Sequence, residues 1–442
     1  MKREIYCEQC WIDGKLQTAT IAIEGGLISE ILPYKTKDAT AVSGVLMPGA
    51  IDAHVHVNEP GRTEWEGFYT ATQAAAAGGI TTIVDMPLNA SPVATTLAAF
   101  EEKLAAAEGK LTVNCGFYAG LVPGNSSELP ALMEAGVLGV KCFLVHSGID
   151  DFPNVEEKDL NEAMPLIAKH KIPLLAHCEI SDGYVSEAFL KAPTSYQNYL
   201  ASRPQEWEVE AVKLVIGLSK QHGCAVHIVH VSASDAIEDI AIARSEGLHV
   251  TAETCPHYIY FNAESIPDGQ TLFKCAPPIR EKANNLMLQK ALQLGILDFI
   301  ASDHSPAPPS IKELESGNLL KAWGGIAGLQ FLLPASWTSL KKVMNLEAFI
   351  PLITEHPAKF LQLNNRKGKI AVGYDADLII WHPEESYEVK AEAILHRHKA
   401  SPYTGNTLFG KVIETIVNGT TVYKDNKIAE GSTSAGKKIF NV

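Results

Sequence analysis

The sequence predicts an α/β fold: a (β/α)8 barrel with a small β-sandwich-like domain formed by both chain ends. Two observations lead to this prediction. The middle of the chain repeats a unit in which a short apolar run precedes a helical stretch, and eight such runs occur, the number that closes a barrel. Both ends instead show strand patterns with turn signals and no helices between them. An open doubly wound sheet is the alternative, but no G-x-G-x-x-G follows the first strand.

The eight apolar runs are the expected barrel strands. They span residues 45–57, 78–87, 111–120, 137–145, 172–179, 224–231, 249–256 and 298–306. Stretches with helical spacing lie between them, most of them ending at a glycine, and cover residues 65–78, 97–109, 160–171, 206–223 and 234–247. Continuous apolar strands that alternate with helices are typical of a parallel sheet buried on both faces.

The chain ends carry the signals of antiparallel strands. Turn dipeptides occur at residues 13–14, 25–26 and 418–419. Neither end is long enough to build a comfortable core alone. We therefore expect one composite β-domain from residues 1–46 plus 367–442, beside a barrel domain of residues 47–366.

Composition and charge exclude several classes of protein. The 442 residues include 37 Lys and Arg against 51 Asp and Glu, a net charge of −14, which argues against nucleic acid or an anionic membrane as partner. The hydrophobic content of 46% excludes disorder as the main state. The sequence lacks a membrane-length apolar run and a signal-peptide core, so we expect a cytoplasmic protein.

Cysteine usage agrees with a reducing compartment. The eight cysteines are scattered, and most lie inside apolar runs, where they would act as small buried hydrophobic residues. Cys7 and Cys10 have C-x-x-C spacing, but no second pair follows to complete a structural zinc site.

Polar residues at the ends of the predicted strands point to a metal site. His54 and His56 are two apart on the first strand, so their side chains share a face. His177, His230 and Asp303 lie at the ends of the fifth, sixth and eighth strands. One such histidine alone would more often be a core or loop residue. Because the carboxyl ends of barrel strands meet at one mouth, the five together predict a Zn, Mn, Co or Fe site.

Lys141 lies near the end of the fourth strand, inside an apolar run. A buried ammonium is costly unless it is paired, and it has no lone pair with which to bind a metal. A neutral amine could instead react with carbon dioxide and form a carbamate able to bridge two cations. Spacing alone favours the alternative, in which Lys141 pairs with an acidic neighbour.

These positions resemble the binuclear amidohydrolase superfamily, and within it the cyclic amidohydrolases, from about Met47 to about Trp381. The resemblance rests on Asp-Ala-His-Val-His at residues 52–56, the lysine, the two later histidines and the aspartate. It implies a homotetramer and two divalent ions per subunit, most simply zinc. The implied metal ligands, with Lys141 carbamylated and bridging, are His54, His56, Lys141, His177, His230 and Asp303.

Longer segments resemble the allantoinase family. They are HVNEPGRTEWEGF (56–68), DMPLN (85–89), KCFLVHSGIDDFPNV (141–155) and AWGGIAG (322–328). The resemblance implies a small neutral cyclic amide as substrate, and ring opening of allantoin to allantoate in purine degradation. The expected mechanism is attack by a metal-bridged hydroxide, with Asp303 as the catalytic proton shuttle.

Other cyclic amidohydrolases remain as alternatives, namely a hydantoinase or dihydropyrimidinase and a dihydroorotase. Dihydroorotases usually read H-x-R-E-P-G, M-P-N-T, N-P-P-L-R and D-H-A-P-H, where this chain has Asn58, Leu88, Ala276 and Ala307. A substrate carboxylate calls for a cation, so these differences favour a neutral substrate. A non-catalytic scaffold is a remote alternative, because the chain keeps all six ligands.

Substrate contacts are harder to predict. We expect Asn89, Ala276 and Ser305 to face the substrate, because the family uses groups near these positions. The role of His146 and Arg62 stays open, and we interpret Arg280 as structural. His257 and His304 are expected to orient their neighbours.

Overall fold

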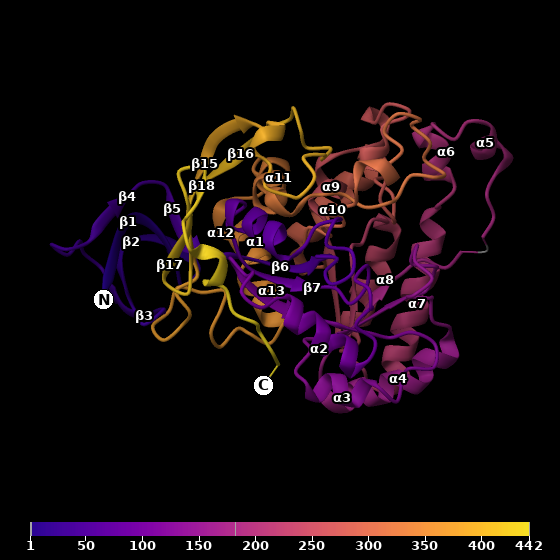
Figure 1. The fold of residues 1–442 in the computed structure, drawn as a ribbon, viewed down its shortest axis with the longest axis horizontal. Helices are drawn as coiled ribbons and strands as arrows, with labels where there is room; N and C mark the ends of the chain where they lie inside the picture. Colours follow the sequence, from indigo (N-terminus) through magenta and orange to yellow (C-terminus); the bar gives the residue numbers. More distant parts are fainter. Residues whose placement is uncertain (1, 182, 442) are drawn as a thin grey trace.

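The computed structural model describes residues 2–181 and 183–441. Strands from both chain ends form a nine-stranded sheet, drawn in indigo and yellow in Figure 1, beside a barrel. The terminal strands are β1 (Arg3–Ile12), β2 (Lys15–Glu24), β3 (Leu27–Leu32), β4 (Thr40–Val42), β5 (Val45–Pro48), β15 (Leu378–Glu388), β16 (Thr407–Val417), β17 (Thr420–Lys424) and β18 (Lys427–Ile428). The antiparallel pairing of β15 with β5 joins the two ends of the chain.

The barrel strands run parallel and follow the order of the sequence. They are β6 (Ala50–Val55), β7 (Ile80–Asp85), β8 (Asn114–Phe117), β9 (Ala119–Gly120), β10 (Val140–Phe143), β11 (Leu174–His177), β12 (Val226–Ile228), β13 (Val250–Thr254) and β14 (Phe299–Ile300). β8 and β9 are separated by Tyr118 alone and fill one of the eight positions. The ring closes where the His56 amide donates to the His304 carbonyl at 2.8 Å, beside a parallel bridge between Val55 and His304.

Helices cover the outside of the barrel. They are α1 (Phe68–Ala77), α2 (Leu97–Ala106), α3 (Leu129–Glu134), α4 (Glu157–His170), α5 (Glu187–Lys191), α6 (Tyr196–Ala201), α7 (Gln205–His222), α8 (Ile237–Ser245), α9 (Pro256–Tyr260), α10 (Lys282–Gln293), α11 (Leu332–Leu340), α12 (Leu346–Phe349) and α13 (Glu355–Phe360). In the described part of the chain, none has the length and apolar character needed to cross a bilayer.

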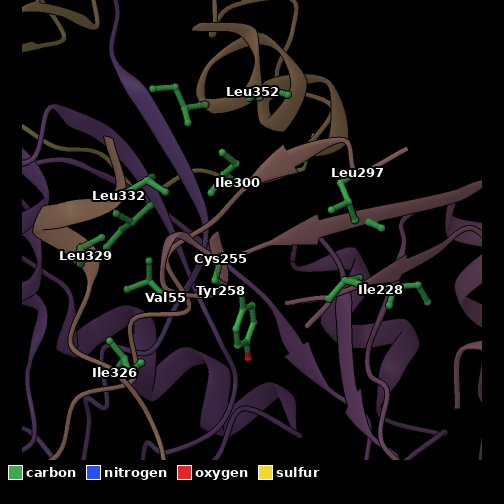
Figure 2. Packing of buried hydrophobic residues seen from close by; sticks show 14 of the residues in the cluster. Val55, Ile228, Cys255, Tyr258, Leu297, Ile300, Ile326, Leu329, Leu332 and Leu352 are labelled. Atoms are coloured by element: carbon green, nitrogen blue, oxygen red, sulfur yellow. The ribbon is translucent and has the colours of Figure 1, made fainter. Parts of the chain in front are cut away.

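Two apolar layers hold the barrel together. The outer layer lies between strands and helices, and Figure 2 shows part of it, with Ile300 of β14 and the surrounding Leu332 and Leu352. The inner layer fills the barrel itself with side chains such as Tyr118 and Phe299, so the barrel is a packed core and not a pore. Full burial of a side chain of this size contributes about 1.5–3 kcal/mol to the stability of the fold. The closed ring fixes where each strand ends.

The predicted fold class is confirmed. Each of the eight predicted apolar runs contains a barrel strand, and the five predicted helical stretches contain most of α1, α2, α4, α7 and α8. Helix α4 begins three residues before the predicted start, because Glu156 and Asp159 form a capping box there. The sequence analysis did not predict the other helices of the described residues, among them α3 and α10, and the limits of the two domains stay a prediction. β5 spans the predicted boundary at residue 46, and residues 437–439 leave the terminal sheet to lie along β8.

Candidate metal centre and substrate cavity

The carboxyl ends of the barrel strands surround a cavity of about 500 Å³. Five of the six predicted metal ligands line it: His54, His56, His177, His230 and Asp303. The three predicted substrate contacts, Asn89, Ala276 and Ser305, line the same cavity. Residues that are up to 251 positions apart in the sequence therefore meet at one mouth, as the barrel interpretation required.

The histidines and the aspartate lie within a few ångströms of one another. Asp303 Oδ1 is 3.3 Å from His54 Nε2 and 3.5 Å from His56 Nε2, and all three side chains are buried. The ring centroids of His177 and His230 are 4.5 Å apart, and those of His54 and His230 are 5.4 Å apart. Atoms of His54, His56 and Asp303 lie close enough together to hold one metal ion.

The backbone is held in an unusual conformation at two of these positions. His230 has φ 39° and Asp303 has φ 44°, in the left-handed region that non-glycine residues seldom adopt. Both residues follow a short strand, β12 and β14 respectively. Such conformations persist only where the surrounding structure enforces them, and they concentrate at functional sites.

Lys141 is fully buried on β10, and its Nζ has no hydrogen-bond partner among the described residues. It lies 4.8 Å from the centroid of the Phe143 ring. Burial lowers the pKa of the Lys141 amine to about 8, because desolvation disfavours the charged form. The acidic partner that spacing alone favoured is not hydrogen-bonded to this amine. An unpaired buried amine beside four imidazoles fits the carbamate interpretation.

One further unsatisfied nitrogen atom supports a metal at this site. His230 Nδ1 is buried and has no hydrogen-bond partner within the described part of the chain. Burial lowers the pKa of His230 well below its usual value and that of His56 to about 4, so both imidazoles are neutral near pH 7. Neutral imidazoles have the lone pair that a metal ligand needs. The residues present therefore fit a bound metal.

Glu253 is a buried carboxylate that the sequence analysis missed. It accepts hydrogen bonds from His54 Nδ1 at 2.5 Å and from His227 Nε2 at 3.2 Å. Burial acts to raise the pKa of Glu253, but His54 and His227 outweigh it and lower the pKa to about 2. A signal was present, because Glu253 is a charged residue inside an apolar strand, as Lys141 is.

Glu179 has the corresponding role behind His177. Its carboxylate accepts from His177 Nε2 at 2.7 Å and from two nitrogen atoms of Arg203, Nε at 2.9 Å and Nη2 at 2.5 Å. Despite burial, Arg203 and His177 lower the pKa of Glu179 to about 2. Glu179 follows His177 by two residues and could have been found from the strand pattern, whereas nothing in the sequence pointed to Arg203.

Arg280, interpreted from the sequence as structural, is buried and pairs with Glu208 at 2.5 Å, in agreement with that role. The two residues left open by the sequence, Arg62 and His146, both line the cavity. Arg62 donates to the Asn89 carbonyl at 3.2 Å and lies over the Trp65 ring, at the cavity wall. His146 also lines the cavity, but its side chain is 55% exposed.

The two histidines expected to orient neighbours are both buried. His304 closes the barrel through its carbonyl, and its Nδ1 accepts from the Leu329 amide at 3.4 Å. His257 lies beside Asp303, with both ring nitrogens unpartnered. Their orienting roles stay predictions.

Comparison with known proteins agrees with this geometry. Residues 45–422 match the amidohydrolase family. The chain belongs to this family. It is 42% identical to an allantoinase of Arabidopsis thaliana, over 95% of this chain and 89% of the relative. It is 40% identical to an allantoinase of Saccharomyces cerevisiae, over 95% and 92%.

The structural comparison gives the same family. The L-hydantoinase (dihydropyrimidinase) from Arthrobacter aurescens superposes with a TM-score of 0.93 at 30% identity and covers 100% of both chains. The amidohydrolase family implies a binuclear metal centre with a carboxylated lysine, and the described residues offer histidine and aspartate candidates for it.

The depressed pKa of Lys141 predicts a specific pH dependence of its modification. With a pKa of about 8, about one amine in ten is neutral at pH 7 and about nine in ten at pH 9, against about one in 2,500 at pH 7 for an ordinary lysine. Only the neutral amine attacks carbon dioxide. At fixed dissolved ¹³CO₂, the rate of carbamate formation in the metal-free protein should therefore rise about tenfold from pH 7 to 9 and then level off.

Carbon-13 NMR measures this rate, and Lys141→Ala supplies the background from other amines. A signal specific to Lys141 that keeps rising about tenfold per pH unit above pH 9 would contradict the lowered pKa.

Proposed function

We propose that this chain opens the ring of allantoin by hydrolysing a cyclic amide bond, giving allantoate. The observation that carries the proposal is the 40–42% identity to allantoinases along nearly the whole chain, in a protein in which five of the six expected metal ligands line one cavity. The hydantoinase neighbour is less similar in sequence, at 30% identity. Dihydroorotate hydrolysis is disfavoured by the residues at positions 58, 88, 276 and 307.

The proposed metal centre uses six side chains. Four imidazoles and the Asp303 carboxylate would hold two divalent ions, with Lys141, carbamylated on Nζ, between them; the imidazoles are those of His54, His56, His177 and His230. Nitrogen and oxygen donors suit Zn²⁺, and we propose zinc over Mn²⁺, Co²⁺ and Fe²⁺. When bound, the ions would supply an activated water and polarise the ring carbonyl.

Asp303 is the proposed proton shuttle. Its carboxylate is 7% exposed, faces His54 and His56, and reaches the cavity. Burial alone would raise the pKa of Asp303, but His54 and His56 hold it below the usual value, so the group is an anion ready to accept a proton. Asp303 would take the proton of the attacking water and pass it to the ring nitrogen that leaves.

The cavity suits a neutral substrate. Four cations line it, and three of them already bind a protein acceptor: Arg203 binds Glu179, Arg62 binds the Asn89 carbonyl, and Lys274 binds the Ala322 carbonyl at 2.6 Å. The fourth, Lys321, is exposed. A substrate carboxylate would have to compete with the protein acceptors of the first three.

Amide-type groups for the substrate remain available in the cavity. Asn89 Oδ1 is buried with no hydrogen-bond partner in the described ranges, 2–181 and 183–441, and it could accept an N–H of the ring or of the ureido arm. Ser305 offers a hydroxyl and Ala276 offers main-chain groups. We propose these three residues as substrate contacts.

Two further proposals come from the sequence. We place the enzyme in the cytoplasm and expect a homotetramer. Size-exclusion chromatography coupled to light scattering would measure the subunit number.

Lys141→Ala should abolish most metal binding and activity, because it removes the proposed bridge. The loss should exceed the about 10- to 100-fold that changes behind the metal ligands cost. Acetate or propionate should partly restore zinc content and turnover by supplying a carboxylate, whereas ethylamine, a cation of similar size, should not. Zinc content by mass spectrometry and allantoin turnover measure the outcome. Full activity of Lys141→Ala without added acid would exclude Lys141 as the bridge.

A three-substrate assay tests the proposed reaction. Metal-loaded protein should give its highest kcat/KM on allantoin, a lower value on unsubstituted hydantoin, which lacks the ureido arm, and the lowest on dihydroorotate, whose carboxylate would have to compete with protein acceptors for three of the four cations that line the cavity. Best turnover on dihydroorotate would contradict the proposal. No turnover on any of the three by a protein with intact zinc content would favour the scaffold alternative.

A further inference from the structure

A line of hydrogen bonds runs through the barrel behind His54, and the metal centre described above does not include most of it. Residues His227 of β12 and Thr251 of β13 are partners in the register of the two strands. Glu253 follows Thr251 by two residues on β13 and so points to the same face. Hydrogen bonds join these three residues to His54 across the barrel interior.

The contacts form one continuous line of hydrogen bonds. Thr251 Oγ1 lies 2.8 Å from His227 Nδ1, His227 Nε2 lies 3.2 Å from Glu253 Oε2, and Glu253 Oε1 lies 2.5 Å from His54 Nδ1. His54 Nε2 then faces Asp303 Oδ1 at 3.3 Å. His54, His227 and Glu253 are each at most 1% exposed, so water does not compete for these bonds.

The chemistry of the groups decides which atom donates and which accepts in each of these hydrogen bonds. An ionised carboxylate only accepts hydrogen bonds, so both nitrogens that face Glu253 must carry protons. A neutral His227 with its proton on Nε2 has a lone pair on Nδ1, which the Thr251 hydroxyl can fill by donating. In the same way, a proton on His54 Nδ1 leaves the lone pair of His54 on Nε2, on the side of the cavity.

We propose that Thr251 and His227 are positioning residues that act through Glu253 to hold His54 in its metal-binding tautomer. Glu253 alone could rotate or take up a proton, but His227 occupies its second oxygen and fixes the carboxylate. Thr251 in turn fixes the proton of His227 on Nε2. The proposal rests on the proposed role of His54 as a metal ligand, and not on the identity of the substrate.

Packing keeps His227 in place independently of its hydrogen bonds. Its ring stacks on Phe299, with centroids 5.1 Å apart and planes 4° apart, and lies 4.2 Å from Phe360 of α13. An aromatic replacement can therefore keep these contacts and lose only the N–H donor. At its Thr251 end, the line of hydrogen bonds reaches a second cavity of about 590 Å³. This cavity lies at the amino ends of the strands, and Thr251 and Phe360 line it.

The test compares Zn²⁺ binding by metal-free variants, titrated against a chelator in buffer with bicarbonate. His227→Phe keeps the stacked ring and leaves Glu253 Oε2 without its donor, so the affinity for Zn²⁺ should fall about 10- to 100-fold. His227→Gln retains an N–H donor and should restore most of this loss. Thr251→Val has the same shape and lacks the hydroxyl, so it should weaken Zn²⁺ binding in the same direction by a smaller factor.

Thr82→Val is the matched control. Thr82 is buried in β7, another barrel strand, and its hydroxyl has no hydrogen-bond partner among the residues that the structure describes. Its replacement should leave Zn²⁺ affinity unchanged. Circular dichroism and thermal unfolding of each metal-free variant separate a loss of folding from a loss of affinity for Zn²⁺. If His227→Phe does not fold, the Zn²⁺ affinity of Thr251→Val tests the proposal.

The outcomes separate the proposed roles of Thr251 and His227 from the metal centre itself. If wild type binds two Zn²⁺ ions and both His227→Phe and Thr251→Val bind them within twofold of wild type, the positioning roles of Thr251 and His227 are wrong and the proposed function stands. A loss in His227→Phe that Gln does not restore would also overturn these positioning roles, because the donor would then not matter. If wild type itself binds no Zn²⁺, the proposed metal centre is wrong as well.

Discussion

The closed barrel brings an amine, four imidazoles and a carboxylate together in a buried site at the ends of its strands. The site depends on how the charges and unpaired polar atoms of these groups are compensated. Within the residues that the structure describes, Lys141 Nζ has no hydrogen-bond partner and His230 has an unsatisfied ring nitrogen. Unpaired buried polar groups of this kind cost about 1–3 kcal/mol each. Cations bound by neutral imidazoles and by a carbamate on Lys141 would give each of these atoms a partner, which explains why a fold would keep such a costly arrangement.

Buried carboxylates behind the histidines orient the predicted metal ligands. Glu253 and Glu179 each accept a ring N–H from a predicted ligand, so that the other nitrogen of the ring can face the cavity. Arg203 balances the charge of Glu179, and His227 supplies the second donor to Glu253. The barrel thus orders the ligands through rigid, buried contacts on its strands, which is more precise than a site built on loops.

Most of the fold and the core of the candidate site could be predicted from the sequence. Strand periodicity located the strands because parallel barrel strands are buried on both faces, and the ligands followed because strand ends converge. The roles of the six ligands stay proposals, although five of them line one cavity and Lys141 lies buried beside them. Glu253 and Glu179 were missed although each is a charge at or in an apolar strand. Arg203 and Thr251 carry no local signal, because their roles depend on which strands become neighbours.

The most direct test of the account is a crystal structure of the protein loaded with Zn²⁺ in the presence of bicarbonate, collected at the zinc absorption edge. The account predicts two anomalous peaks among His54, His56, His177, His230 and Asp303, with extra density on Lys141 Nζ that bridges them. An unmodified Lys141 amine and no zinc at the strand ends would contradict it.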